Sequence, residues 1–150
     1  MKKLRIGIIG CGGIANNKHF PALKACSEIS EMVAFCDIVE DRAITAAKEF
    51  GAENAKVYTD YNELLKDATI DLVHILTPNV SHSPIAVAAF EAGKHVMCEK
   101  PMAHTYKDAQ KMVEAWKKSG KKFTVGYQNR FRNEVQALQK SCQDNELGEI

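Results

Sequence analysis

The sequence predicts an α/β fold built on a parallel, doubly wound sheet, and three observations support this prediction. Short apolar runs alternate with segments of helical periodicity along all 150 residues, as in parallel strands joined by crossover helices. The first apolar run, residues 4–9, leads into a glycine-rich turn, and Asp37 ends the second run. A glycine turn after the first strand and right-handed crossovers together favour the strand order 3-2-1-4-5-6.

The glycine-rich turn, residues 10–15, reads Gly-Cys-Gly-Gly-Ile-Ala and matches the Gly-x-Gly-x-x-Ala pattern of dinucleotide-binding Rossmann folds. Gly10 permits the tight turn, Gly12 lets the backbone approach a pyrophosphate, and Ala15 allows the next helix to pack closely on the strand. The N–H groups that open this helix would face the phosphates. The expected cofactor contacts in this turn are Gly10, Gly12, Gly13, Ile14 and Ala15.

Asp37 follows the glycine turn by about 20 residues, where an acid that binds the ribose hydroxyls is expected. Its carboxylate would repel a 2′-phosphate, which favours NAD over NADP. Arg42 is the opposing observation, because an arginine in this region can accommodate that phosphate. Arg42 lies in the first turn of the next predicted helix, so we give Asp37 the greater weight and expect the cofactor to be NAD. Arg42 is expected to be a further cofactor contact.

The first two crossovers contain clear helix signals. The helix after the glycine turn is expected to be interrupted at His19–Pro21, and Pro21 can restart a helix as its first residue. The next helix covers residues 40–50 and ends at Gly51, which suits the left-handed conformation after a helix. Residues 57–58 then form a short third strand.

The fourth strand and its preceding helix form the middle of the sequence. Asp60 caps a brief helix, with Glu63 as its capping-box partner. The strand over residues 72–76 is apolar on both faces apart from His74. Such continuous apolarity is typical of a parallel strand that helices cover on both sides.

The last third continues the alternation of helices and strands. A helix opens at Ser83–Pro84 and ends at Gly93, and residues 95–98 form the fifth strand. Thr105 with Asp108 resembles a capping box and starts the following helix. The remaining predicted elements are a strand over residues 123–125 and a helix over about 133–143.

Composition excludes several classes of function. The 20 Lys and Arg nearly balance the 19 Asp and Glu, so no strong field recruits nucleic acid or an acidic membrane. No apolar run approaches a membrane span or a signal peptide in length, so we expect a cytoplasmic protein. The five cysteines form no Cys-x-x-Cys pair, and His95 and Cys98 fall on opposite faces of a strand. We therefore expect neither disulfides nor a metal site.

Polar residues gather in the loops that follow the strands, where ligands of such sheets bind. The loop after the fourth strand begins Thr77-Pro78-Asn79 and reaches His82. Asn79 is either a cofactor contact or a turn residue. His82 either lines the nicotinamide side of a cofactor or makes a polar contact at the start of its helix.

These motifs together resemble the Gfo/Idh/MocA family of oxidoreductases, and Glu99-Lys100-Pro101 after the fifth strand is the most discriminating of them. The other matching segments are the glycine turn, Thr77-Pro78-Asn79 with His82, residues 93–96 and residues 126–131. The resemblance implies NAD(P)-dependent oxidation or reduction of a sugar, a polyol or a similar hydroxy compound. It also implies cofactor contacts by Thr77, Pro78, Asn79, His82, Glu99, Lys100 and Gln128.

Lys100 is the expected catalytic residue. An ammonium at the end of the fifth strand can hydrogen-bond a substrate hydroxyl and stabilise the alkoxide that develops as hydride leaves. The alternative is an ordinary surface lysine before a turn proline, and the neighbouring Glu99 favours the catalytic role. The resemblance also suggests a cis Lys100–Pro101 peptide. Arg130 either meets substrate or braces a second domain.

The family resemblance implies a two-domain enzyme. Residues 1–131 are expected to form the dinucleotide-binding domain, and residues 132–150 a crossover helix and the start of a C-terminal substrate domain that the chain lacks. We expect the chain to bind the dinucleotide without turning over sugar by itself, and the full-length enzyme to form homo-oligomers. The alternative is a free-standing nucleotide-binding module that senses or scaffolds. Glu99-Lys100-Pro101 favours the enzyme, whereas the end of the chain at Ile150 favours the module.

Overall fold

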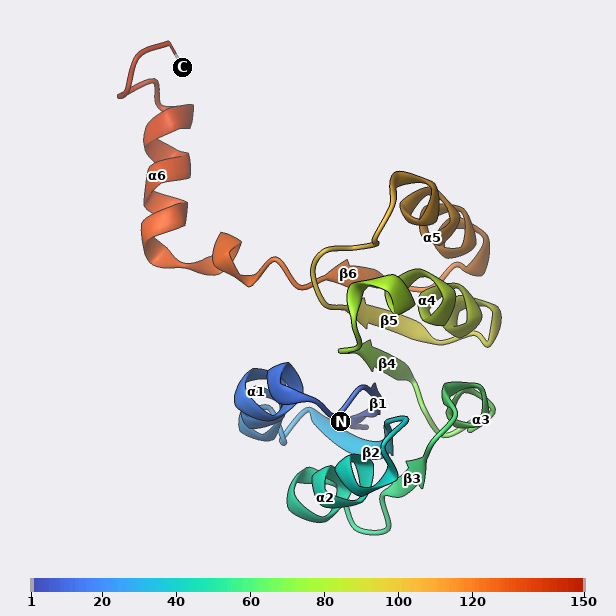
Figure 1. Ribbon diagram of the computed structural model, residues 1–150. Coiled ribbons are helices and arrows are strands. Elements are labelled where there is room, and N and C mark those ends of the chain that lie inside the picture. The colour runs from blue at the N-terminus through green and yellow to red at the C-terminus, as the bar shows by residue number, and fades with distance from the viewer. Residues whose placement is uncertain (1, 150) are drawn as a thin grey trace.

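A computed structural model describes residues 2–149 and contains one six-stranded parallel sheet, shown in Figure 1. The strand order is β3-β2-β1-β4-β5-β6, which confirms the predicted order 3-2-1-4-5-6 and the α/β class. The strands are β1 (Leu4–Ile9), β2 (Ser30–Cys36), β3 (Lys56–Tyr58), β4 (Leu72–Ile75), β5 (His95–Cys98) and β6 (Phe123–Val125).

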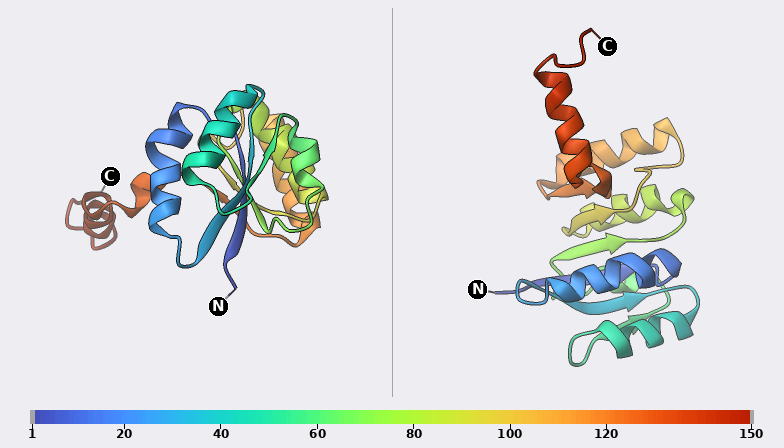
Figure 2. Two further views of the ribbon diagram at one scale, coloured as in Figure 1. Left: turned by 90° about the horizontal axis from the view of Figure 1, so that it is seen from below. Right: turned by 90° about the vertical axis from the view of Figure 1, so that its left-hand side faces the viewer.

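Helices cover both faces of this sheet. Figure 1 shows α1 and α2 on one side and α3, α4 and α5 on the other, and Figure 2 shows the same layers from two further directions. The helices are α1 (Phe20–Ala25), α2 (Glu40–Phe50), α3 (Tyr61–Leu65), α4 (His82–Glu91), α5 (Tyr106–Ser119) and α6 (Asn133–Gln143). A π-helical turn (Ala15–His19) and two 3₁₀ turns (Asn79–Ser81 and Gln128–Phe131) complete the described elements.

Each helical layer encloses its own hydrophobic core. Phe20 of α1 packs against Phe35 of β2 on one face, with ring centroids 5.8 Å apart. On the other face Phe90 of α4 packs edge-on against Phe123 of β6, with centroids 5.4 Å apart. The chain changes face between β1 and β4, so a crevice opens beyond the carboxyl ends of these strands. This edge is where the predicted site residues lie.

The first helix differs from its prediction because it is not interrupted at His19–Pro21. The π-helical turn runs directly into α1, and the N–H of Phe20 donates to the carbonyl of Ala15. In a regular α-helix the ring of Pro21 would clash with the carbonyl four residues earlier. The wider π turn accommodates the proline without ending the helix, and Pro21 lies at the start of α1, as the expected restart of a helix there required.

Two predicted helix signals were also wrong in their mechanism. Gly51 does end α2, but its φ of −70° is not left-handed. A Cβ at Gly51 would collide with the carbonyl oxygen of Ala47, so close approach explains the glycine. Asp60 caps α3 by accepting from the N–H of Asn62, whereas Glu63 pairs with Lys66 instead of closing a capping box.

The predicted start of α5 at Thr105 is confirmed, but only half of the capping box forms, because the Asp108 carboxylate binds the hydroxyl of Thr105 and not its N–H. Thr105 accepts a hydrogen bond from the N–H of Asp108, and its hydroxyl donates to the Asp108 carboxylate at 2.7 Å. Thus a threonine with a short acid three residues later was a reliable start signal for this helix.

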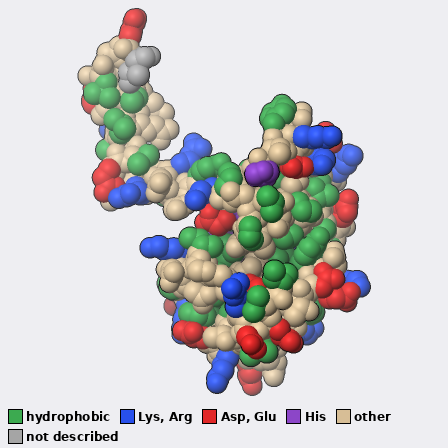
Figure 3. Space-filling view, viewed as in Figure 1, with side chains coloured by type: hydrophobic (Ala, Val, Ile, Leu, Met, Phe, Trp, Pro, Cys, Tyr) green, Lys and Arg blue, Asp and Glu red, His purple; other side chains and the backbone are tan. Residues whose placement is uncertain are grey.

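The C-terminal helix α6 stands apart from the rest of the molecule, as Figures 1 and 3 show. No residue of α6 is buried, and its apolar side chains Val135 and Leu138 are exposed. Within residues 2–149 no helix combines the length and apolar character needed to cross a membrane. Ile150, the last residue of the expected second-domain start, lies outside the described residues.

Candidate cofactor-binding site

The glycine turn leaves β1 with a backbone that only glycine adopts easily. Gly10 has a φ of +98°, and its N–H donates to the carbonyl of Cys36 at 2.8 Å. A Cβ at Gly10 would lie 2.8 Å from the carbonyl group of Leu76 and 2.9 Å from the nitrogen of Thr77. Side chains essentially never approach backbone so closely. The turn therefore needs glycine both for its conformation and for its contact with the end of β4.

Beyond Gly10 the turn opens outward. A Cβ at Gly12 would meet no atom within 4 Å, so packing inside the protein does not explain this glycine. Free space in front of the backbone is what a bound pyrophosphate requires. Ala15 is fully buried, as expected of the residue that brings the helix close to the strand. The side-chain amide of Asn16 donates to the carbonyls of Cys11 and Gly12, at 2.9 Å each, and fixes the turn.

Asp37 connects the end of β2 to the glycine turn. Its Oδ2 accepts from the N–H of Cys11 at 2.8 Å, and its Oδ1 accepts from the N–H of Val39 at 2.9 Å. The side chain is only 8% exposed, and the guanidinium of Arg42 lies 4.0 Å from Oδ1. Because two backbone groups fix the carboxylate, its remaining lone pairs point in defined directions at the edge of the crevice.

These groups line a cavity of about 610 Å³. Such a volume falls within the usual range for cofactor and small-molecule sites. Ten of the lining residues belong to the glycine turn, the ends of β1 and β2 and the loop after β4: Ile9, Gly10, Gly12, Gly13, Ile14, Cys36, Asp37, Leu76, Thr77 and Pro78. Arg42 completes the predicted residues in this wall.

The hydroxyl of Thr77 is a second observation that favours a ligand in this cavity. Its hydroxyl is buried and has no hydrogen-bond partner within residues 2–149. Buried polar atoms normally have a partner, and Thr77 lines the cavity. The glycine cradle, the fixed carboxylate and this hydroxyl together fit a dinucleotide.

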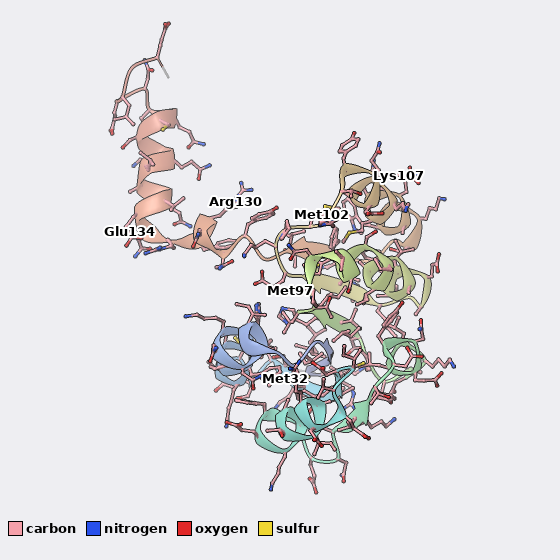
Figure 4. All side chains as sticks on the ribbon, viewed as in Figure 1. Met32, Met97, Met102, Lys107, Arg130 and Glu134 are labelled. Carbon is pink, nitrogen blue, oxygen red and sulfur yellow. The ribbon has the colours of Figure 1, made fainter. Side chains whose placement is uncertain are left out.

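The other predicted contacts lie outside the cavity wall. Asn79 is exposed and starts a 3₁₀ turn, and Gln128 is exposed on the 3₁₀ turn after β6. Lys100 is also exposed, at the end of β5. Figure 4 places Arg130 on the segment that leads from the sheet toward α6. The geometry thus brings together the residues predicted to contact the adenosine and the phosphates, but not these outer residues.

His82 is not placed to contact a cofactor, which corrects that reading of its role. The residue is fully buried at the start of α4. Its Nδ1 lies 2.8 Å from the carbonyl oxygen of Pro101, and its Nε2 lies 2.9 Å from that of Thr77. A polar ring at this position instead ties two site loops together.

Glu99 is buried, and its carboxylate faces the first helix. Its Oε1 lies 2.9 Å from Nε2 of His19, and its Oε2 accepts from the N–H of Lys100 at 2.7 Å. The Lys100–Pro101 peptide is cis, as the family resemblance suggested. Both oxygens of Glu99 therefore contact protein groups, whereas Lys100 is exposed.

The sequence did not reveal several residues of this region. The cavity is also lined by residues that the sequence analysis did not assign to the site: Ile38, Thr59, Tyr61, Ser81, Pro84 and Ile85. Ile38, 90% exposed beside the ribose acid, carried a usable signal, since an apolar side chain there has little to pack on in the protein alone. His19 was noted only as part of a helix interruption, although it contacts Glu99.

The cysteines of the site are structural. Burial, followed by the charge of Asp37, raises the pKa of the Cys11 and Cys36 thiols to about 12. They therefore remain neutral at physiological pH and behave as small apolar side chains. Within residues 2–149 no group of three or more His, Cys, Asp or Glu residues is placed to hold a metal ion.

Comparison with known families shows to which family this chain belongs. A family model described as "Oxidoreductase family, NAD-binding Rossmann fold" matches residues 4–127, from β1 to just beyond β6. The chain belongs to the Gfo/Idh/MocA oxidoreductase family. The glycine turn, Asp37 and Glu99-Lys100-Pro101 all fall inside the matched segment.

Similar proteins of this family include named dehydrogenases. Inositol 2-dehydrogenase of Salmonella typhimurium is 37% identical over 147 residues, which cover 97% of this chain and 43% of the relative. D-glucoside 3-dehydrogenase of Escherichia coli is 35% identical over 147 residues, covering 98% of this chain and 41% of the relative. The chain thus spans less than half the length of these curated relatives.

Solved structures of the family share the fold closely. The WlbA dehydrogenase of Bordetella pertussis, in complex with NADH and UDP-GlcNAcA, matches with a TM-score of 0.91 and 30% identity over 99% of this chain and 44% of that one. Scyllo-inositol dehydrogenase of Lactobacillus casei, with bound NAD(H) and scyllo-inositol, matches with a TM-score of 0.88 and 26% identity. It covers 99% of this chain and 43% of that one. The Gfo/Idh/MocA chain described here therefore corresponds to their NAD-binding part.

Proposed function

We propose that this chain is the cofactor-binding domain of an NAD-dependent oxidoreductase that transfers hydride between nicotinamide and a hydroxyl-bearing carbon of a sugar, polyol or related compound. The observation that carries the proposal is the joining of Asp37 to the glycine turn through the N–H of Cys11. This bond joins the carboxylate that would bind the ribose to the backbone that would face the pyrophosphate, and both line one cavity. When bound, the cofactor supplies the hydride acceptor or donor.

The preference for NAD over NADP follows from the charge at Asp37. Its fixed carboxylate can accept hydrogen bonds from both ribose hydroxyls and would repel a 2′-phosphate. Arg42 is the opposing charge, since its guanidinium lies 4.0 Å from the same carboxylate and also lines the cavity. Asp37 is the group that two backbone hydrogen bonds hold in place, so we give it the greater weight. We therefore expect NAD to bind more tightly than NADP.

Lys100 is proposed as the catalytic group of the complete enzyme. Asp37 lies at the end of β2 and the glycine turn follows β1, so the nicotinamide half of a bound dinucleotide extends toward β4 and β5. Lys100 directly follows that edge, and its ammonium makes no hydrogen bond or ion pair within residues 2–149. A free ammonium there is available to hydrogen-bond a substrate hydroxyl and to stabilise the developing alkoxide.

The substrate class and cellular setting are part of the proposal. The relatives are named for inositol and for a glucoside, which supports a polyol or sugar substrate. The free cysteines fit a reducing compartment, so we place the protein in the cytoplasm. The exposed apolar residues of α6 support association into a homo-oligomer in the full-length enzyme.

A non-catalytic nucleotide-binding module is the second candidate. It is favoured by the position of Lys100 and Gln128 outside the cavity wall, since binding of the adenosine and pyrophosphate does not require them. Hydride transfer needs a substrate carbon held about 3–3.5 Å from the nicotinamide in an aligned pose. The described residues supply one wall for such a pocket.

Calorimetry with NADH, followed by a dehydrogenase assay on a panel of sugars and inositols, tests the proposal. We expect saturable NADH binding and no turnover by the 150-residue chain alone. Failure to bind NADH would overturn the proposed function. Turnover by this chain would instead show that its residues complete the active site without a second domain.

A further inference from the structure

The main chain on both sides of Lys100 is fixed by buried groups, although its own side chain is free. Before it, the carboxylate of Glu99 turns back and accepts from the N–H of Lys100 at 2.7 Å. After it, the carbonyl oxygen of Pro101 lies 2.8 Å from Nδ1 of His82. The lysine thus projects from a short segment whose two flanking residues are each held by the protein core.

The carboxylate that holds Lys100 is itself held by His19. Nε2 of His19 lies 2.9 Å from Oε1 of Glu99, and the two side chains are only 14% and 8% exposed. A hydrogen bond to a carboxylate is strengthened where water is largely excluded. One oxygen of Glu99 binds His19, and the other binds the N–H of Lys100. Because both oxygens are held, the rotation of the carboxylate is fixed.

Two further groups lie close to the pair formed by Glu99 and His19. A Cβ at Gly126, just after β6, would lie 3.4 Å from Oε1 of Glu99, so the backbone passes close over the carboxylate. The ring of His74 meets the ring of His19 edge-on, with centroids 4.7 Å apart. Burial, followed by the charge of His19, lowers the pKa of His74 to about 3. His74 is therefore neutral at physiological pH and supports His19 without carrying a competing charge.

The two histidines approach Lys100 from opposite faces of the sheet. His19 ends the π-helical turn that leads into α1, whereas His82 begins α4, and Figure 1 shows these helices on opposite sides. Nε2 of His82 also lies 2.9 Å from the carbonyl oxygen of Thr77, in the cavity wall, so the single N–H of the neutral ring donates to one of the two carbonyls. The segment that carries Lys100 is thereby linked to both the glycine-turn helix and the loop after β4.

We propose that His19, acting through Glu99, is a positioning residue for Lys100, with His82 holding the next peptide from the opposite face. The inference rests on the catalytic role proposed above for Lys100. It adds that the helix after the glycine turn sets the direction of the lysine toward the nicotinamide half of the cofactor. The alternative is that the contact between His19 and Glu99 only stabilises the fold. Its loss would then affect binding of the two halves of a dinucleotide to the same extent.

A binding experiment with two ligands separates these alternatives. NADH carries the nicotinamide half, whereas ADP-ribose contains the adenosine and pyrophosphate without nicotinamide. We expect His19→Leu to weaken NADH binding about tenfold, as loss of a well-placed hydrogen bond does, and to leave ADP-ribose within about twofold. Lys100→Met should cause the same selective loss of NADH affinity. The size of this loss is the reference for the loss in His19→Leu.

His19→Gln is the conservative variant, because its side-chain amide retains a donor for Glu99. We expect it to restore NADH affinity to within about threefold of the unmodified chain. His95→Leu is the matched control. It removes another histidine, whose Nδ1 accepts from the N–H of Lys122 at the amino end of β5, far from Lys100 along the strand.

Amide hydrogen exchange gives a readout that does not depend on ligand. In the ¹⁵N-labelled chain we expect His19→Leu to accelerate exchange at the Lys100 N–H at least about tenfold, since Glu99 is then free to rotate away. His19→Gln should retain most of the protection. His95→Leu should expose the Lys122 N–H and leave Lys100 unchanged. The dispersion of the other amide signals shows whether each variant is folded.

The outcomes separate this inference from the proposed function. Equal losses of NADH and ADP-ribose affinity, or unchanged Lys100 exchange in folded His19→Leu, would overturn the positioning role. If the unmodified chain binds neither ligand, the proposed function fails, and hydrogen exchange at Lys100 decides the role of His19 by itself.

Discussion

His74 sits in the middle of β4 at a cost to stability. The residue is 2% exposed, and neither ring nitrogen has a hydrogen-bond partner within residues 2–149. An unsatisfied buried polar group costs about 1–3 kcal/mol. We expect His74→Phe, which keeps an aromatic ring against His19, to raise the free energy of unfolding at pH 7 by this amount. Urea unfolding measures the change, and His104→Phe at an exposed position is the control. A loss of stability would show that the ring nitrogens are satisfied in solution.

The same residue predicts a pH dependence. Burial lowers the pKa of His74 from 6.5 to about 3, so between these values the unfolded chain binds a proton that the folded protein does not. Stability is therefore lost as the pH falls below 6.5, by about 1.4 kcal/mol per unit. His74→Phe removes this loss, so its advantage over the unmodified chain should grow between pH 7 and pH 5. Urea unfolding at several pH values measures the difference, and a constant difference would contradict the prediction.

Asp37 is the residue that should decide cofactor choice. Asp37→Asn keeps one oxygen to accept from the backbone but removes the charge and part of the ribose contact. A hydrogen bond to a charged group contributes about 1.5–3 kcal/mol, so NAD affinity should fall at least about tenfold. NADP affinity should fall less or rise, because the repulsion of its 2′-phosphate is gone. Calorimetry with both cofactors checks this, with Asp41→Asn on the exposed face of α2 as the control. Tighter binding of NADP than NAD by the unmodified chain would contradict the premise.

Among single residues, the sequence predicted those whose roles follow from local rules. Gly10 is required by its own φ and its turn, and Asp37 by its place after β2. The contact between His19 and Glu99 joins residues 80 positions apart, so no local pattern indicates it. The burial of His82 likewise depends on the position of Pro101, which belongs to another loop.

Among the connecting elements, the turn between α3 and β4 depends on Asp67. Its carboxylate accepts from Nζ of Lys56 at 2.7 Å and from both the N–H and the hydroxyl of Thr69. Burial raises the pKa of Asp67, but these hydrogen bonds outweigh it and hold the pKa below its usual value. The backbone carbonyl of the same residue accepts from the buried Nζ of Lys94 at 2.7 Å.

Asp67→Asn should therefore destabilise the protein at neutral pH by about 2 kcal/mol, since the charge that strengthens these bonds is lost. A carboxyl whose pKa is lowered on folding contributes stability above its unfolded pKa and loses it as the pH falls toward the folded value. The difference between the variant and the unmodified chain should then shrink below about pH 4. Thermal unfolding at pH 7 and pH 3 tests both statements. An equal difference at the two values would assign the effect to packing rather than charge.

The helices and strands also show where local sequence patterns are not sufficient to predict the structure. The bounds of α2, β5, β6 and α6 were predicted from the sequence: Gly51 marks the end of α2, and apolar runs mark β5 and β6. No side chain caps the start of α2 or of α6, so their first residues follow from helical periodicity alone. The first helix was not predicted correctly, because the rule that proline interrupts a helix ignores the π turn as another solution. That turn also presents His19 toward Glu99, a contact that is visible only once the sheet has assembled.

For the whole molecule, the strand order places the site. The sheet changes direction between β1 and β4, and right-handed crossovers then send α1 and α2 to one face and α4 and α5 to the other. The crevice beyond these two strands follows from this topology, which the sequence predicted. The cavity wall from Ile38, Tyr61 and Ser81 did not follow, since it depends on how α3 and the loop after β4 approach one another in space.

The arrangement of the chain also supports a boundary near residue 131, which we propose as the end of the dinucleotide-binding domain. Helix α6 has 11 residues, none of them buried, and Figure 3 shows it as an arm separate from the body. Helices of this length are marginal in water without tertiary contacts. Its contribution to the stability of the domain should therefore be small.

Removing residues 132–150 should leave the free energy of unfolding of the body within about 0.5 kcal/mol of the intact chain, as for surface changes that break no buried contact. NADH affinity should be unchanged, because the cavity is lined only by residues between 9 and 85. The control ends the chain at Gly120, which removes β6 and with it Phe123, packed against Phe90 and Trp116 in the core. That shorter chain should lose several kcal/mol, about what deletion of a buried phenylalanine costs, or fail to fold. Urea unfolding compares the three chains. A large loss in the first truncation would mean that α6 packs on the body in solution, and the boundary would then have to move beyond it.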